Sequence, residues 1–159
     1  LPILKIMSSL FVHGFFVIIM YGVFLIGGNP PMLTWLQVIY YAFAASMLAL
    51  AISYLTSAVT VFFKDMAQIV SICLQFGMWM VPIMWSVEMF PSAPSWLEQV
   101  LKINPVYYIV VGYRDSMLTG NWFWERPTLT LYFWGVTIVV MLVGLRMFKR
   151  LRPHFSDVL

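Results

Sequence analysis

The amino-acid sequence predicts an all-α protein embedded in a membrane, and two features carry that prediction. Of the 159 residues, 62% are hydrophobic and 9% are charged, whereas an ordinary soluble domain carries roughly 25% charged residues. In addition, no charged residue occurs from Ile6 to Phe63. A soluble domain of this length buries too small a share of its surface to hide so many apolar side chains. Lipid must therefore solvate the outer faces of the helices.

Four apolar stretches are long enough to cross a bilayer, whose hydrocarbon core is spanned by about 20 helical residues. The predicted spans are residues 6–26, 36–61, 66–87 and 127–145. The turn Gly27–Pro31 separates the first two, because its prolines remove backbone donors and its glycines favour turn geometry. No linker or charge block divides the chain, so residues 1–159 are interpreted as one membrane domain.

The segment between the third and fourth spans, residues 88–126, differs in character. Its apolar pieces, residues 96–103 and 106–113, are too short to cross and suit interfacial or re-entrant helices. Pro82 removes a backbone hydrogen bond late in the third span, and Asn104–Pro105 interrupts the region again. We expect the chain to turn back here, with its non-helical backbone covered by protein or facing water.

The basic residues predict the orientation of the spans. Three of the nine, Lys102, Arg114 and Arg126, share one side with four acidic residues. The other six lie together on the opposite side: Lys5, Lys64, Arg146, Lys149, Arg150 and Arg152. Cytoplasmic loops are rich in Lys and Arg. Both ends of the chain are therefore predicted inside, and residues 88–126 outside.

Several function classes find no support in these residues. The chain has no G-x-x-x-x-G-K-[ST] phosphate loop, so it cannot bind ATP in the P-loop manner by itself. No carboxylate lies within a span to relay protons, and the net charge of +3 does not indicate nucleic acid. The single cysteine, Cys73, excludes an internal disulfide framework. We expect no cofactor or metal on this chain.

Polar side chains inside the spans are the first candidate functional residues. They form two helical stripes, one of Ser46, Ser53, Ser57 and Thr60 and one of Gln68, Ser71 and Gln75. A stripe of this kind lines a hydrated path or lets helices approach closely. We favour helix contact for the Ser/Thr stripe and leave both roles open for Gln68 and Gln75. His13 is interpreted as a neutral imidazole bonded to a neighbouring helix, with a functional ionisable group as the alternative.

Aromatic residues and one arginine complete the candidates for a substrate path. The aromatic candidates are Phe76, Trp79, Trp85, Tyr107, Tyr108 and Tyr113. An interfacial belt explains such residues by default, and the alternative is a lining on which sugar rings pack. Arg114 is either a solvated anchor or a phosphate contact, because its planar fork binds phosphate through two hydrogen bonds. Asp115 would then position Arg114 or weaken its grip, without a direct ion pair between these neighbours.

Several motifs in this chain resemble, in order and spacing, those of the type-two ABC export permeases. They are Phe62-Phe63-Lys64-Asp65, Val81-Pro82-Ile83, Ile103–Tyr108 followed by Gly112-Tyr113-Arg114, and the tail Leu151–Leu159. Within that family the chain is most similar to the branch that exports teichoic acid, over residues 104–114, 120–124 and 131–134. Lys64 and Val81 depart mildly from the family pattern, which has Arg and Ser there.

The resemblance implies a transport subunit rather than an enzyme. The full protein would have six spans, of which this chain holds four, and would form a homodimer with separate ATPase subunits that hold ATP and Mg²⁺. The substrate would be a lipid-linked surface polymer, teichoic acid or a related polysaccharide. Its lipid anchor would travel through the membrane lipid of the bacterial plasma membrane alongside the protein.

Two alternatives stay open at this point. The first is a type-two drug or lipid exporter, whose path is expected to show fewer aromatic residues gathered on the outside. The second is a membrane-embedded glycan-modifying enzyme. Such an enzyme needs carboxylates or histidines that converge near one interface, and the sequence offers Glu88, Glu98 and Asp115 on the predicted outer side.

The orientation yields a labelling prediction. Cysteine is placed at Lys64 or at Glu98 in a Cys73→Ala background, and whole cells are treated with a membrane-impermeant maleimide. Glu98→Cys should react because residue 98 is predicted outside, and Lys64→Cys should react only after the cells are permeabilised. Labelling of Lys64→Cys but not Glu98→Cys in intact cells would invert the orientation.

Overall fold

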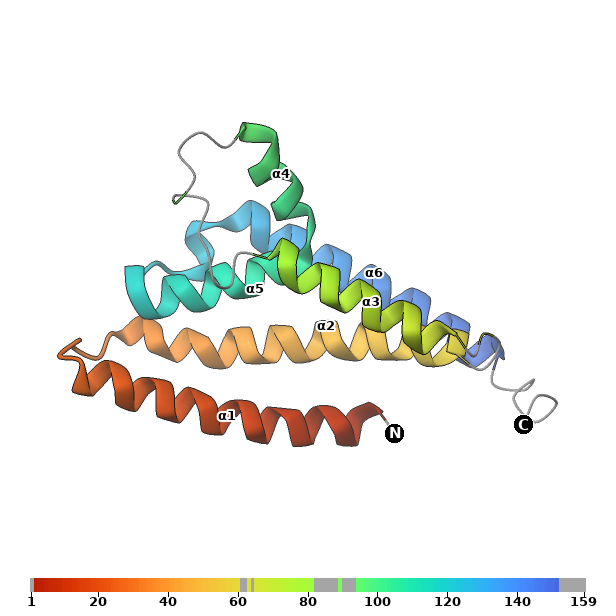
Figure 1. The fold of residues 1–159 in the computed structure, drawn as a ribbon, viewed down its shortest axis with the longest axis horizontal. Coiled ribbons are helices and arrows are strands. Elements are labelled where there is room, and N and C mark those ends of the chain that lie inside the picture. Colours follow the sequence, from red (N-terminus) through yellow and green to blue (C-terminus); the bar gives the residue numbers. More distant parts are fainter. Residues whose placement is uncertain (1, 61–62, 64, 82–88, 90–93, 152–159) are drawn as a thin grey trace.

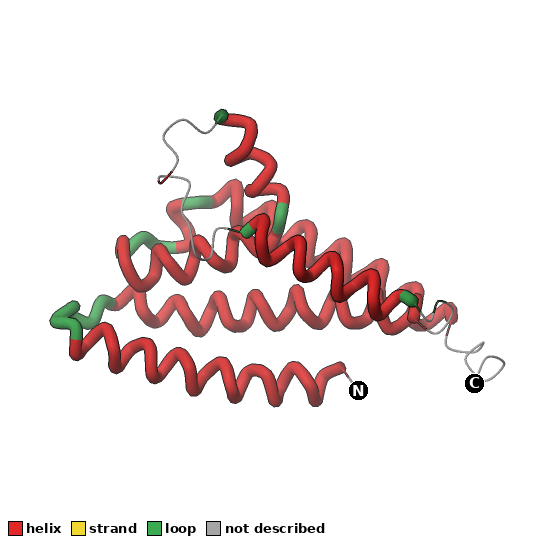
Figure 2. Tube along the Cα trace, in the orientation of Figure 1, coloured by secondary structure: helices red, strands yellow, loops and turns green. Residues whose placement is uncertain are grey.

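The computed structural model describes residues 2–60, 63, 65–81, 89 and 94–151. Its six α-helices are α1 (Pro2–Ile26), α2 (Gln37–Thr60), α3 (Met66–Met80), α4 (Ser95–Ile103), α5 (Pro105–Arg114) and α6 (Pro127–Leu151). Three short helical turns join them, η1 (Leu33–Leu36), η3 (Asp115–Thr119) and η4 (Phe123–Glu125). Figure 2 shows the described chain as helices linked by short loops, without strands. The predicted all-α class is confirmed.

Three helical segments among the described residues are long and apolar enough to cross a membrane. They are Ile3–Ile26, Leu33–Thr60 and Pro127–Arg150, and they coincide with the first, second and fourth predicted spans. The last helix continues to Leu151 instead of ending with the apolar stretch at Leu145. Lys149 and Arg150 fall in its final turn, where the exposed carbonyl groups attract positive charge.

The third predicted span is helical only in part. Helix α3 has 15 residues, which is roughly 22 Å at 1.5 Å per residue and short of a hydrocarbon core of about 30 Å. Val81, which follows it, is extended with φ −88° and ψ 131°. A residue before proline is disfavoured in the α conformation, so this geometry is what Pro82 requires. Pro82 itself and the rest of the predicted span lie outside the described residues.

Helix α2 is the centre of the bundle, flanked by α1 on one side and by α5 and α6 on the other (Figure 1). Ala44, Ala51 and Ala58 are fully buried and, at a spacing of seven residues, share one face of α2. At Gly144 of α6, a Cβ atom would lie 2.9 Å from the backbone nitrogen of Leu55. The two helices therefore meet at backbone distance, which small residues permit.

The Ser/Thr stripe of α2 does not carry this contact. Three of its four hydroxyl groups donate to carbonyl oxygens of their own helix, Ser46 to Ala42 at 2.7 Å, Ser57 to Tyr54 at 3.2 Å and Thr60 to Thr56 at 2.7 Å. Thr56 donates in the same way to Ile52 at 2.9 Å. A hydroxyl bonded to its own helix presents no free donor to a neighbour. At the contact between α2 and α6, the buried alanines and Gly144 allow the close approach.

Helix α5 approaches α2 at a second glycine. A Cβ atom on Gly112 would overlap the ring of Tyr41, which is itself buried at the centre of the core. Around this contact lies a cluster that joins α2, α5 and α6, with Leu48, Tyr108 and Phe133 among its members. The short helix α5 is thus packed inside the bundle although it is too short to cross a membrane.

The helical turn that follows α5 is one residue longer than an α-helical turn. Residues Asp115–Thr119 form a π-helix, which the amide of Gly120 closes by donating to the carbonyl oxygen of Asp115 at 2.8 Å. Gly120 has φ 74°, a left-handed conformation that glycine adopts without strain. This turn redirects the chain from α5 toward η4 and α6.

The glycine contacts predict opposite effects for the same substitution. Glycine to alanine on an open helix surface should be neutral or stabilising by up to about 1 kcal/mol, as expected for Gly135→Ala, where no atom lies near the new Cβ. Gly112→Ala and Gly144→Ala should instead destabilise by about 1–3 kcal/mol because they overpack a tight contact. Thermal unfolding of the purified protein measures the difference. Equal midpoints for all three variants would contradict the close approach.

Candidate functional site

The corner between α4 and α5 is built by Asn104 and Pro105. The Asn104 side chain accepts a hydrogen bond from the amide of Val106 at 3.0 Å, and Pro105 occupies the first helical position. An asparagine cap followed by proline is a favoured helix start. The predicted interruption at Asn104–Pro105 is therefore the point where α5 begins. On the inner side of the corner, Leu101 of α4 packs against Tyr107 and Val111.

Gln37, at the start of α2, holds the turn between α5 and α6 in place. Its side-chain nitrogen donates to the carbonyl oxygen of Asn121 at 2.9 Å, and its oxygen accepts from the amide of Phe123 at 2.7 Å. Thr34 adds a hydrogen bond to the carbonyl oxygen of Ser116 at 2.9 Å. Our sequence interpretation did not single out Gln37. The available signal was a lone amide side chain in an apolar stretch, which must find partners when buried.

Asp115 is paired with Arg126. The arginine Nε lies 3.1 Å from Oδ2, and one terminal nitrogen lies 3.4 Å from Oδ1. Thr119 also donates to Oδ1 at 3.2 Å. Burial raises the pKa of the Asp115 carboxyl, while the Arg126 guanidinium opposes that rise. The carboxylate of Asp115 thus has Arg126 as an ion-pair partner, and the hypothesis that it positions Arg114, which is half-buried at the end of α5, stays a prediction.

Tyr108 belongs to a hydrogen-bonded network inside the bundle. Its hydroxyl lies 3.2 Å from the hydroxyl of Tyr40 and 3.0 Å from Oγ1 of Thr130. The indole N–H of Trp134 donates to Tyr40 at 2.8 Å, and the ring of Phe133 stacks on Tyr108. Tyr107 is likewise buried. Both tyrosines face the interior of this chain and not an open surface.

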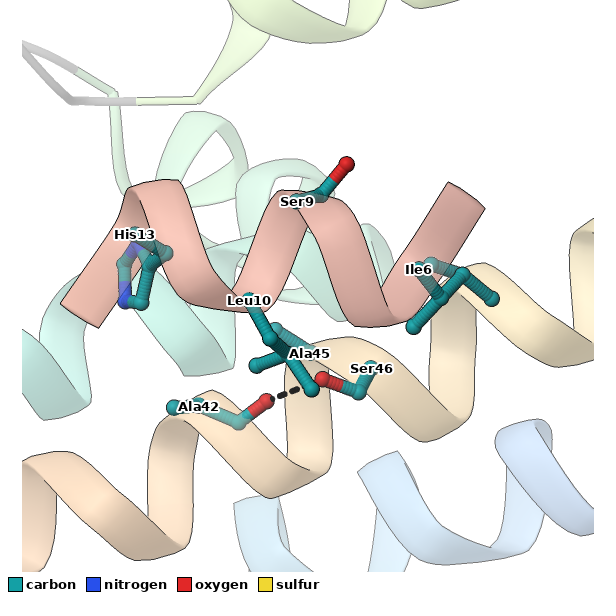
Figure 3. A pocket seen from close by; sticks show the side chains of 8 residues that line it. Ile6, Ser9, Leu10, His13, Ala42, Ala45 and Ser46 are labelled. Carbon is teal, nitrogen blue, oxygen red and sulfur yellow. Dashed lines mark hydrogen bonds between the residues drawn. The ribbon is translucent and has the colours of Figure 1, made fainter. Parts of the chain in front are cut away.

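Tyr113 connects α5 to α1. Its hydroxyl lies 2.6 Å from Nε2 of His13, and the two rings meet edge to face. This contact confirms the interpretation that His13 bonds to a neighbouring helix. Beside it, a cleft of about 290 Å³ separates α1 from α2. Figure 3 shows His13 at one end of that cleft and Ile6 at the other.

The candidate path residues on α3 are on the surface of the described chain and not in its core. Gln68, Gln75, Phe76 and Trp79 are all exposed, and Trp79 reaches 78% exposure. Helix α3 has no buried residue. The structure therefore does not gather the α3 and α5 candidates into one lining, and their role in a path stays a prediction. Trp85, like Pro82, lies outside the described residues.

The face that α3 presents follows from its helical period. Met66, Val70 and Gly77, which lie on one side, are half-buried and mark the side toward the rest of the bundle. Gln68, Gln75 and Trp79 project from the opposite side, because residues seven and eleven positions apart fall within about 20° of each other on an α-helix. Amide and aromatic side chains thus share one outward face.

The acidic residues considered for glycan-modifying chemistry are Glu88, Glu98 and Asp115. Glu98 forms an exposed pair with Lys102 at 2.7 Å, Asp115 is bound to Arg126, and Glu88 lies outside the described residues. Over the described part of the chain, no group of three His, Cys, Asp or Glu side chains could hold a metal ion. Glu98 and Asp115, the described members of the three acids considered for glycan-modifying chemistry, are therefore each paired with a basic residue of their own.

Comparison with known proteins defines the class. Residues 3–118 match the model of a family described as the ABC-2 type transporter. The chain therefore belongs to the ABC-2 type transporter family, and it is a multi-pass protein of the bacterial cell membrane. The export-permease resemblance of its motifs is confirmed at the level of the family.

The curated relatives carry a more particular name. Two proteins called O-antigen export system permease protein RfbA, from Klebsiella pneumoniae, are 28% and 27% identical to the chain over 133 residues. These residues make up 83% of this chain and 49% of each relative. The chain thus spans about half the length of the curated relatives it matches. No similar solved structure was found.

The Gln37 contacts predict a local effect on the outer turn. Gln37→Leu should leave a backbone carbonyl and a backbone amide without partners, at about 1–3 kcal/mol for each buried group. The turn should then open, so chymotrypsin should cleave faster among Trp122, Phe123 and Trp124. Gln99→Leu is the matched control, because Gln99 is exposed on α4. Unchanged cleavage in Gln37→Leu would show that these bonds do not hold the turn.

Proposed function

We propose that the chain is part of the permease subunit of an ATP-driven exporter of a lipid-linked cell-surface polymer. The observation that carries the proposal is the similarity to two O-antigen export permeases over 83% of the chain. Family membership over residues 3–118 supports the same assignment. Because the sequence has no phosphate loop, ATP and Mg²⁺ would be bound by a separate ATPase subunit.

The polymer proposed first is a polysaccharide, since both relatives are named for O-antigen export. Teichoic acid is the second candidate, and it rests on the resemblance of residues 104–114 to the teichoic acid branch. Both polymers present sugar or polyol units together with a lipid anchor. The chemistry required of the path is therefore similar: stacking surfaces, hydrogen-bonding groups and a tolerance for phosphate.

The path is proposed to run along the outward face of α3. Gln68 and Gln75 supply hydrogen bonds there, and Trp79 with Phe76 supplies ring surfaces against which sugar C–H groups pack. Since α3 turns this face away from the chain's own core, its opposite wall would come from a second copy of the permease. Trp85 would extend the lining beyond the break at Pro82.

Helix α5 is proposed to back this path. Tyr107 and Tyr108 are buried, so they would hold α5 rigid and would not touch the polymer. Tyr113 and Arg114 lie at the half-buried end of α5, and Arg114 would attract phosphate at the outer mouth through its planar fork. The lipid anchor would stay in the membrane lipid around the apolar faces of α1 and α6.

The proposal is tested by restoring export. In cells that lack the permease, the full-length protein and its ATPase should return the polymer to the cell surface, measured by immunoblot of surface material. Trp79→Ala and Gln75→Leu should lower the amount while the permease level is unchanged. Leu74→Ala is the control, since Leu74 is exposed on a different face of α3. Failure of the wild type would refute the export function, and full export by both variants would remove α3 from the path.

A further inference from the structure

Helix α1 is held to the bundle in an unusual way for a helix of 25 residues. None of its spanning stretch is buried inside the described chain, and its side-chain hydrogen bonds and ring contacts with other described elements lie at two aromatic groups. One lies near its end at Tyr21 and Phe24, and the other lies at His13 in its middle. A helix fastened at two points is able to pivot on one of them when the other is released.

The first attachment is broad. The ring of Tyr21 stacks on Trp35 with centroids 4.9 Å apart and planes 9° apart, and its hydroxyl donates to the carbonyl oxygen of Trp35 at 2.6 Å. Phe24 meets the same indole edge to face. Trp35 is itself buried. These combined contacts fix the end of α1 next to the turn into η1, so this end is the natural pivot.

The second attachment is a single polar contact. Nε2 of His13 lies 2.6 Å from the hydroxyl of Tyr113, and His13 is about 12 Å along the helix from Tyr21, or eight residues at 1.5 Å each. Tyr113 is in turn packed on the buried ring of Tyr41. Two polar groups at this depth lose free energy when separated without new partners. The bond therefore favours the docked position of α1.

No polar bridge supports α1 across the cleft that begins at His13. The cleft separates the segment from Ile6 to His13 from small residues of α2, including Ala45. The hydroxyl of Ser46, which also lines it, already donates to Ala42 within α2, as the dashed line in Figure 3 shows. Among the described side chains that line the cleft, only His13 has a hydrogen bond that joins α1 to another helix.

We propose that His13 and Tyr113 form a latch that sets the width of the cleft between α1 and α2. With the bond made, α1 lies along the bundle. With the bond broken, α1 swings about the Tyr21–Trp35 contact and opens the cleft toward lipid. Because Tyr113 belongs to α5, the latch links the position of α1 to that of the re-entrant helix.

Cross-linking across the cleft tests the latch without relying on export. Leu10 and Ala45 face each other there (Figure 3), so Leu10→Cys and Ala45→Cys are combined with Cys73→Ala in the full-length permease with its ATPase. Oxidation in membranes then reports how often the cleft is closed. Tyr113→Phe should lower the closed-to-open ratio of the cleft about threefold, the effect of a typical interhelical hydrogen bond in a membrane, and should therefore slow disulfide formation.

A double-mutant comparison separates the bond from general damage. His13→Leu should lower the rate like Tyr113→Phe, and combining both should lower it no further, because each alone removes the whole bond. Tyr132→Phe is the control, since Tyr132 bonds to the carbonyl oxygen of Ile103 and not to α1. An unchanged rate in Tyr113→Phe, additive losses in the pair, or an equal loss in Tyr132→Phe would each overturn the latch.

That the latch opens during transport rests on the proposed function, so it is tested by a separate experiment. His13→Cys and Tyr113→Cys are joined in the Cys73→Ala background by a short bis-methanethiosulfonate, which forms a disulfide with each thiolate, releases methanesulfinate and locks the contact. Locked transporters should lose export that the unjoined double variant retains. If the wild type exports nothing, the proposed function fails while the cross-linking result still decides the latch. Full export by the locked form would show that the latch never opens during transport.

Discussion

The backbone-distance contact between α2 and α6 is the constraint on which the other interactions depend. Lipid is as apolar as leucine, so helices in a membrane gain little from burying apolar surface and associate through close packing. Ala44, Ala51 and Ala58 are fully buried on α2, and Gly144 lets α6 approach the backbone at Leu55. This approach brings Tyr40 and Trp134 within hydrogen-bonding distance. A larger side chain at the contact would separate the donors and acceptors of the whole network.

The irregular segment between α5 and α6 depends on hydrogen bonds and not on close packing. Backbone outside a helix must find hydrogen bonds from protein or water at membrane depth. Here Gln37 serves both a carbonyl group and an amide group, and Thr34 serves another carbonyl. The ion pair of Asp115 and Arg126 closes the same turn through two contacts. The segment that follows helix α5 is therefore held in place by polar side chains.

Hydropathy and helix-breaking residues predicted the frame of the molecule because they act locally. The first span, the corner at Asn104 and the break before Pro82 all follow from residues adjacent in the chain. The side-chain partners did not follow. Asp115 forms an ion pair with Arg126, eleven residues away, because a π-helical turn redirects the chain between them. Ser46 and Ser57 donate hydrogen bonds to their own helix α2. Their spacing in the sequence cannot distinguish this bond from one to a neighbouring helix. Likewise, tyrosine is a residue type typical of the membrane interface, yet Tyr107 and Tyr108 are buried. Their burial depends on the angle between α5 and α2, which the local sequence does not show.

The contact between His13 and Tyr113 has a consequence for the biogenesis of the protein. These residues are separated by 100 positions, and chains are synthesised at about 5–20 residues per second. The helix that carries His13 is thus made roughly 5 to 20 seconds before the tyrosine that secures it. During that interval the imidazole is without its Tyr113 partner, whereas the Tyr21–Trp35 contact, 14 positions apart, can already form. The His13–Tyr113 contact is consequently made late, after α5 has been synthesised, and it completes an attachment of α1 that begins at Trp35.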